Sequence, residues 1–209
     1  MSYVLICVTA FAVSGILYGL NVLLQKLAAK EKCYRAMPFC MQIVSFPFAV
    51  AVCIIFDRIP FDFKSLISWQ MWLTAIATVV ISSLVVLVAG RKRTSDETIA
   101  LRCLEAATME IVQRVFMQTF IYGLLRFNGL KVFMAIPLNA IVFCADIAVE
   151  AIICRDKNLK KIAYEMLSSM LFSLGIGFVY FISNCFVIPM LAHAAERFVT
   201  ASIENRRNN

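Results

Sequence analysis

The feature that most constrains this sequence is a series of apolar stretches, each long enough to cross a lipid bilayer, that recurs along the whole chain. A helix needs about 20 residues to cross the hydrocarbon core. Seven such stretches cover residues 3–25, 36–56, 66–90, 98–125, 131–154, 163–183 and 185–204. Because lipid offers no partners to backbone N–H and C=O groups, helices are the economical way to span it. The sequence therefore predicts an all-α, polytopic transmembrane helix bundle of about seven spans.

The composition agrees with this interpretation. Of the 209 residues, 62% are hydrophobic and 16% are charged, and the mean hydropathy is +0.84. A soluble domain of this length cannot hide so much apolar surface from water. We therefore expect an integral membrane protein surrounded by lipid, with N-terminal spans in residues 1–97, a second helical half in residues 98–204 and a short cytoplasmic tail in residues 205–209.

Lysine and arginine residues indicate how the chain crosses the membrane, because cytoplasmic loops are enriched in them. Thirteen lie in alternate connections and in the C-terminal tail: Lys26, Lys30, Lys32, Arg35, Arg91, Lys92, Arg93, Arg155, Lys157, Lys160, Lys161, Arg206 and Arg207. The connections between those hold four, namely Arg58, Lys64, Arg126 and Lys131. This asymmetry predicts an external N-terminus and a cytoplasmic C-terminus.

The charge and cysteine patterns argue against several other classes of protein. The net charge of +7 is divided among short loops, so we expect no nucleic-acid partner. The cysteines fall mostly inside apolar stretches, where Cys behaves as a small hydrophobic residue, and no CxxC pair occurs. They are Cys7, Cys33, Cys40, Cys53, Cys103, Cys144, Cys154 and Cys185. We therefore expect no disulfide framework, no metal site and no cofactor.

Glycine and proline positions suggest two local features of the helices. Gly15 and Gly19 form a GxxxG pattern, which predicts close packing of the first helix against a neighbour. A short polar turn follows residue 182, and Pro189 then lies in the first turn or so of the last helix, where its missing N–H costs little.

Ionisable residues inside the apolar stretches are the informative ones for function. They are Glu105, Glu110, Arg114, Asp146, Glu150, His193, Glu196 and Arg197. A charge at the centre of a membrane helix costs roughly 2.5–3.5 kcal/mol on insertion scales. Several such costs require either partners or a wet cavity, so we expect the fourth, fifth and seventh spans to be neighbours around a polar cavity.

The spacing of these residues allows two interpretations. Glu110 and Arg114 are four residues apart, so they share a helix face and can form an ion pair. Asp146 and Glu150 share a face for the same reason, as do His193 and Arg197. The pairs either lock the bundle together as structural contacts or line a functional site.

Three short segments of residues 98–204 add a family resemblance. Residues 109–114 read MEIVQR, residues 142–146 read VFCAD and residues 193–197 read HAAER. In order and spacing they resemble the EExxxR, FxxxH and HxxxN motifs of the CPBP family of CAAX prenyl endopeptidases and bacteriocin-processing enzymes, also called Abi proteins. The resemblance implies an intramembrane endopeptidase, acting on a peptide or protein substrate at a membrane that for prokaryotic members is the bacterial plasma membrane.

The resemblance also assigns roles to residues of this chain. In the family, the paired glutamates and the second-motif histidine activate a water molecule, and the third-motif histidine and asparagine stabilise the oxyanion. This sequence keeps Glu110, Arg114 and His193, whereas Met109, Asp146 and Arg197 stand where the family has Glu, His and Asn. The implied catalytic set is therefore Glu110, Arg114, Asp146 and His193, supported by Glu105, Glu150, Glu196 and Arg197.

These replacements leave more than one function open. Met109 cannot accept a proton, so Asp146 or Glu110 must act as the base in a peptidase, with His193 or Arg197 as the donor to the oxyanion. A family member that has lost its catalytic site and acts in binding, scaffolding or bacteriocin immunity is equally compatible with these residues. A small transporter that uses the carboxylates as a proton relay is a third class.

Overall fold

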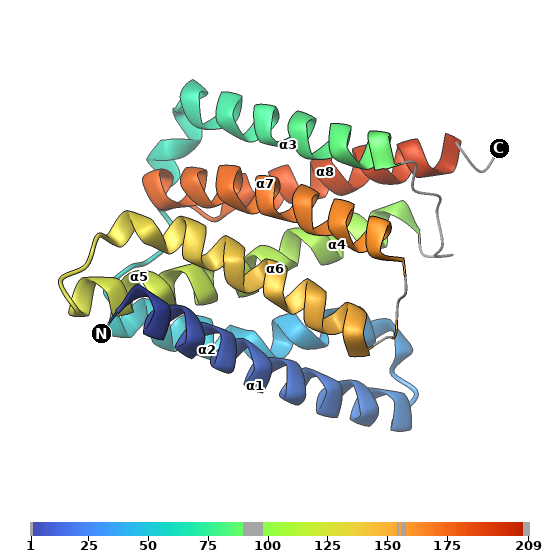
Figure 1. Ribbon diagram of the computed structural model, residues 1–209, viewed down its shortest axis with the longest axis horizontal. Coiled ribbons are helices and arrows are strands. Elements are labelled where there is room, and N and C mark those ends of the chain that lie inside the picture. The colour runs from blue at the N-terminus through green and yellow to red at the C-terminus, as the bar shows by residue number, and fades with distance from the viewer. Residues whose placement is uncertain (1, 90–97, 154, 156–157, 207–209) are drawn as a thin grey trace.

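The computed structural model describes residues 2–89, 98–153, 155 and 158–206, and these residues form a bundle of helices (Figure 1). The first half contains α1 (Tyr3–Lys30), the 3-10 helix η1 (Tyr34–Phe39), α2 (Cys40–Ile55), the 3-10 helix η2 (Phe63–Ile67) and α3 (Trp69–Ala89). The second half contains α4 (Ile99–Glu110), the π-helix η3 (Ile111–Gln118), α5 (Thr119–Phe127), the 3-10 helix η4 (Val132–Met134), α6 (Ala135–Ile153), α7 (Leu159–Ser183) and α8 (Val187–Arg206).

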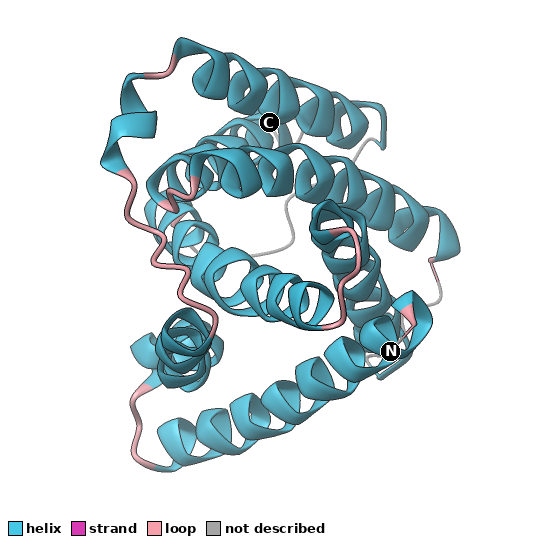
Figure 2. Ribbon diagram, turned by 90° about the vertical axis from the view of Figure 1, so that its left-hand side faces the viewer, coloured by secondary structure: helices cyan, strands magenta, loops and turns pink. Residues whose placement is uncertain are grey.

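The all-α class predicted from the sequence is confirmed. Figure 2 shows helices and loops throughout the described chain, and its β-type pairing is limited to one isolated bridge between Phe61 and Cys185. Because α4, η3 and α5 follow one another without a break, the chain forms seven long helical segments.

Five of the seven segments are long and apolar enough to cross a membrane. They are Tyr3–Lys30, Met37–Ile55, Trp69–Ala89, Val132–Ile153 and Leu159–Ser183. The other two, residues 99–127 and α8, carry most of the buried ionisable residues, which lowers their hydropathy. The structure therefore supports a membrane protein with five apolar spans, whereas seven crossings remain the prediction from sequence.

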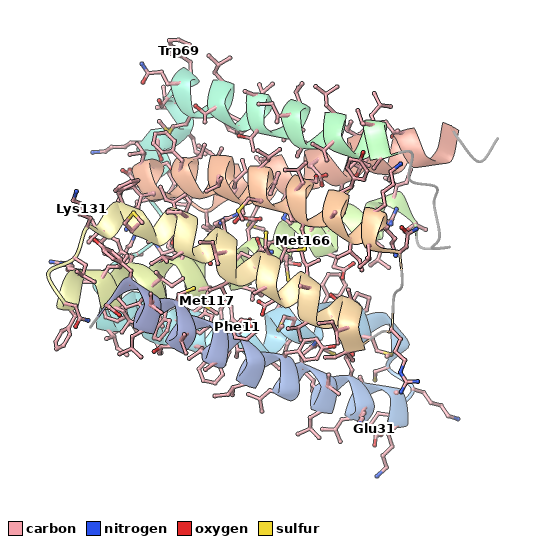
Figure 3. All side chains as sticks on the ribbon, viewed as in Figure 1. Phe11, Glu31, Trp69, Met117, Lys131 and Met166 are labelled. Atoms are coloured by element: carbon pink, nitrogen blue, oxygen red, sulfur yellow. The ribbon has the colours of Figure 1, made fainter. Side chains whose placement is uncertain are left out.

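The helices run roughly side by side, so the connections gather at two ends of the bundle. In Figure 1 the N-terminus lies at the left end and the C-terminus at the right end. Figure 3 shows Glu31, after α1, at the right end, and Trp69 and Lys131 at the left end. The helix ends that flank the connections rich in Lys and Arg thus share the end at which α8 finishes.

Local side-chain contacts explain several helix boundaries. The Ser2, Thr98 and Asn158 side chains accept hydrogen bonds from the backbone N–H groups of Leu5, Leu101 and Lys161, and so cap α1, α4 and α7. Asn184 has a left-handed backbone (φ 45°) and ends α7. The predicted polar turn is confirmed, and Pro189 lies in the first turn of α8.

Arg58 fixes the turn between α7 and α8. Its Nε donates to Asn184 Oδ1 at 3.1 Å, and its Nη2 donates to the Phe181 carbonyl at 3.0 Å. The guanidinium also lies over the Tyr122 ring, 4.2 Å from the centroid, which is cation–π geometry. The connection between α2 and α3 is therefore attached to the second half of the chain.

Two apolar cores lie on either side of the bundle. The larger joins α1, α2, η3, α5 and α6 and includes Ile6, Leu17, Phe116, Ile121 and Leu138. The smaller joins α3, α7 and α8 and includes Ala75, Phe172, Ile176, Val179 and Ile188. The helices η3 and α7 pack against each other between the two cores.

Gly15 and Gly19 make no close helix contact within the described part of the chain, because a Cβ atom added at either residue would meet no atom within 4 Å. Close helix contact occurs instead on α7. A Cβ at Gly175 would clash with Thr78 on α3, and one at Gly177 would lie 3.1 Å from Gln118 Oε1. Glycine is therefore required where α7 approaches its two neighbours, and not on α1.

The arrangement of the loops leads to a topology prediction. A reporter fused after Asn209 should be active only on the cytoplasmic side, and one fused in the 56–68 connection only on the outer side, because the helix ends that flank the basic connections lie at the end where α8 finishes. Fusions to a periplasm-active and a cytoplasm-active reporter measure this directly. Activity of both fusions on the same side would contradict the arrangement.

Candidate functional site

Three of the predicted site residues form a compact buried cluster. Arg114 Nε donates to Glu110 Oε2 at 3.0 Å, one turn along the same helical segment. His193 Nδ1, on α8, lies 2.7 Å from Glu110 Oε1. Glu110 and Arg114 have no exposed surface and His193 is 6% exposed. Both oxygens of the Glu110 carboxylate are therefore engaged, and the predicted Glu110–Arg114 pair is present.

Arg114 continues the network across to α7. Its Nη1 donates to Ser173 Oγ at 3.1 Å and to Gln118 Oε1 at 3.3 Å. Gln118 Nε2 in turn donates to the Gly177 carbonyl at 2.8 Å. This close contact is possible because residue 177 has no Cβ. The network ties η3 to α7, between the two apolar cores.

The π-helical turn of η3 positions these side chains. A π-helix hydrogen-bonds five residues back, and Thr119 Oγ1 likewise donates to the Arg114 carbonyl, five residues earlier, at 3.2 Å. The Thr119 hydroxyl also lies 3.0 Å from Tyr180 Oη on α7. The widened turn thus places Arg114, Gln118 and Thr119 toward α7 in succession. Short π-helical segments frequently occur at functional sites.

A separate cavity of about 380 Å³ lies among α1, α2, α4, η3 and α6. Its polar lining residues are Ser14, Asn21, Gln25, Gln42, Glu105, Gln113, Asn139, Asp146 and Glu150. Its apolar walls include Phe11 of α1 and Met117 of η3, both labelled in Figure 3. None of Glu110, Arg114 and His193 lines this cavity.

Asp146 belongs to this cavity and not to the Glu110 cluster. Its Oδ2 accepts a hydrogen bond of 2.6 Å from Ser14 Oγ on α1. Glu150 lies one turn further along α6 and also lines the cavity, as does Glu105 from α4. No described lysine, arginine or histidine lines it, so the cavity carries an excess of negative charge.

Three lining amides have side-chain atoms without a hydrogen-bond partner among the described residues. They are Asn21 Oδ1, Gln113 Nε2 and Asn139 Nδ2. Each of these residues is more than nine-tenths buried. Buried polar atoms are nearly always hydrogen-bonded in folded proteins. The cavity thus offers a ligand two hydrogen-bond donors, Gln113 Nε2 and Asn139 Nδ2, and one acceptor, Asn21 Oδ1.

The structure therefore divides the predicted site into two parts. Glu110, Arg114 and His193 lie together, whereas Asp146, Glu105 and Glu150 line the cavity on the far side of the same α4–η3 segment. The expected packing of all three polar spans around one cavity differs from what is found, because α6 packs mainly on α7 and α1 while α8 packs on α4 and α3.

The remaining two predicted residues lie further along α8. Glu196 is buried and pairs with Arg197, Nε to Oε2, at 3.5 Å. Side-chain exposure of Arg197 is 43%. His193 and Arg197, which are four residues apart, thus have different partners: His193 lies against Glu110 of α4, whereas Arg197 pairs with Glu196.

Sequence reasoning that followed charge alone missed the neutral side chains of the cavity. Gln113 and Asn139 lie in apolar stretches and carry no charge. A signal was present on α1, where Ser14, Asn21 and Gln25 recur at intervals of seven and four residues and so share one helix face. A polar stripe of this kind along an apolar span indicates contact with something other than lipid.

The chain was also compared with known proteins. No family model, no characterised protein and no solved structure matches it. The CPBP resemblance therefore stays a prediction from the three motifs.

The buried ion pair leads to a stability prediction. Glu110→Gln should lower the free energy of unfolding by about 3–5 kcal/mol, because it leaves the Arg114 guanidinium buried without a counter-charge. Thermal or denaturant unfolding in detergent, followed by the fluorescence of Trp69 and Trp72, provides the measurement. The double variant Glu110→Gln/Arg114→Met removes both charges and should recover much of the loss. A double variant as unstable as Glu110→Gln would rule out the ion pair as the cause.

Proposed function

We propose that this chain is a ligand-binding membrane protein built on a CPBP-like helix bundle that has lost its peptidase site. The cavity among α1, α2, α4, η3 and α6 holds the ligand, and the Glu110–Arg114–His193 cluster holds the helices together. The observation that carries the proposal is the division of the motif residues between these two places.

The division follows a pattern. Met109 and Asp146, which stand where the family resemblance has a water-activating glutamate and histidine, both line the cavity. Glu110, Arg114 and His193, which the chain shares with the family, lie outside it. The motif positions that line the cavity, Met109 and Asp146, therefore differ from the family residues. The motif positions that match the family, Glu110, Arg114 and His193, lie outside the cavity.

The cluster is poorly arranged for hydrolysis. A general base must reach the water from which it takes a proton. Glu110 has no exposed surface and accepts from Arg114 on one oxygen while the other lies against His193. Of the two carboxylates that could act as the base, Glu110 and Asp146, only Asp146 lines the cavity, and Met109 in the same lining cannot accept a proton.

The cavity has the general properties of a small-molecule site. Such sites are concave and mostly apolar, with a few converging polar groups, and commonly enclose about 300–1,000 Å³. The cavity here encloses about 380 Å³ and combines aromatic and methionine side chains with amides and carboxylates. A binding role of this kind includes the immunity and scaffold functions that the resemblance allows.

One observation favours a peptidase as the second candidate. Glu110 holds His193 Nδ1, and His193 Nε2 has no hydrogen-bond partner among the residues that the structure describes. A carboxylate that orients a histidine in this way is the arrangement found in catalytic triads. In this alternative His193 acts as the base and the α4–α8 packing opens to admit a peptide.

The binding proposal predicts a specific effect of filling the cavity. Gly15 lines it, and Gly19, one turn on, does not, and a Cβ at either residue meets open space. Gly15→Leu should therefore abolish retention of a bound small molecule while the matched control Gly19→Leu retains it. Native mass spectrometry of the protein released from nanodiscs, after incubation with cell extract, measures this retention. Equal retention by the two variants would contradict the proposal.

The two candidate functions also differ in a cleavage assay. The binding proposal expects the purified protein to cleave no member of a peptide library. Loss of a catalytic base typically lowers a rate by 10²–10⁴-fold. Cleavage by the unmodified protein that falls by that factor in His193→Gln, with the variant still monodisperse in detergent, would replace the binding proposal with the peptidase.

A further inference from the structure

We propose that the cavity binds a protonated organic amine, with the ammonium group held by Asp146 and Glu150 and an apolar body against the cavity walls. This inference rests on the proposed binding function and names the chemical class of its ligand. The observations that support it are the charge of the lining, the unpartnered amides and the character of the walls.

The charge of the lining selects a cation. Asp146 and Glu150 are one helical turn apart on α6, and both face the cavity. Two like charges at this spacing repel each other when both are ionised. No basic residue of the described chain lines the cavity to compensate them. A cationic group between the two carboxylates relieves their repulsion. It also replaces the water molecules that the carboxylates lose when they are enclosed in the bundle.

The unpartnered amides indicate a ligand with hydrogen-bonding groups and exclude a cavity built only for lipid chains. Gln113 Nε2 and Asn139 Nδ2 are free to donate, and Asn21 Oδ1 is free to accept. An acyl chain would leave all three without partners, at a cost for each buried group. An ammonium group with N–H bonds can donate to Asn21 as well as to the carboxylates, and a polar group on the ligand body can accept from the other two.

The walls distinguish an organic amine from a metal ion or a hydrophilic polyamine. Among the described residues no three His, Cys, Asp or Glu side chains are grouped closely enough to hold a metal. Phe11, Tyr18, Met41 and Phe143 contribute large apolar surfaces to the lining. A cavity of about 380 Å³ admits a small amphiphilic molecule. The fitting ligand therefore has one charged end and one apolar end.

An ammonium group of this kind has two sources in a membrane. It belongs either to a free amphiphilic amine or to the headgroup of an aminophospholipid such as phosphatidylethanolamine. The polar lining continues to Gln25 and Glu150, close to the ends of α1 and α6, so the cavity reaches the level of the bundle at which headgroups lie. The experiment below separates the two sources.

The test uses the full chain in nanodiscs whose only lipid, phosphatidylcholine, has no N–H group on its cationic headgroup. The probe is 4-phenylbutylamine, and 4-phenylbutanol is its neutral counterpart. Calorimetric titration should show saturable binding of the amine and at least about tenfold weaker binding of the alcohol, the factor that one charge-assisted hydrogen bond contributes. Asp146→Asn/Glu150→Gln should weaken amine binding at least about tenfold and leave alcohol binding unchanged. Glu196→Gln, which lies outside the cavity, should leave both unchanged.

The outcomes discriminate clearly. Equal affinity for amine and alcohol, or amine binding that survives Asp146→Asn/Glu150→Gln, overturns the inference, and unchanged alcohol binding by that variant shows that it is folded. If the double variant misfolds, the comparison of amine with alcohol on the unmodified protein still decides. Replacing half the lipid with phosphatidylethanolamine should weaken probe binding if the headgroup is the ligand and leave it unchanged if a free amine is.

Failure of this inference differs from failure of the binding function. A protein that retains a neutral molecule in the Gly15→Leu and Gly19→Leu comparison, yet does not prefer the amine, is a binding protein for another ligand class. A protein that retains nothing in that comparison fails as a binding protein altogether.

Discussion

A guanidinium that is completely enclosed among apolar helices must find its hydrogen-bond partners inside the protein, because lipid supplies none. Arg114 is such a group. Its Nε and Nη1 have partners on α4, η3 and α7, with α8 reached through Glu110, whereas its Nη2 has no partner among the described residues. Removing one partner leaves a buried charge, so these contacts hold one another in place. The two apolar cores, which share no helix, meet across this polar contact. The Arg114 contacts therefore connect η3, which belongs to the larger core, with α7, which belongs to the smaller one.

The same constraint explains why the α4–η3 segment has two distinct faces. Glu110 and Arg114 share the face that is directed at α7 and α8, and this face is closed by its own ion pair. Met109 and Gln113 are shifted by one residue from that pair and so turn toward α1 and α6, where the cavity lies. Glu110 cannot contact a ligand in the cavity, because its carboxylate pairs with Arg114 and His193. The chemistry of the cavity therefore depends on Asp146, Glu150 and the amides.

The sequence allowed part of this arrangement to be predicted. The helical class follows from the apolar stretches, and the Glu110–Arg114 pair follows from its spacing of four residues, because both depend on local periodicity. The partition of Asp146 away from His193 depends on which helices pack together, and that is decided by contacts distant in sequence. The π-helical turn was not predicted from the sequence. Gly15 and Gly19 matched a packing motif, but the motif does not say whether a partner helix is present.

The polar lining of the cavity lowers the stability of the fold, whereas an apolar lining of similar volume would not. Asn21, Gln113 and Asn139 each bury an amide with an unused atom, and Asp146 and Glu150 place like charges within one turn of a helix. Apolar residues of similar volume at these positions would fill the space without either cost. In the Arg114 network both oxygens of the Glu110 carboxylate and both polar atoms of the Gln118 carboxamide have partners, whereas Arg114 Nη2 has none among the described residues. The three unpartnered amides are grouped along the cavity lining, where a ligand can supply the hydrogen bonds that the chain does not.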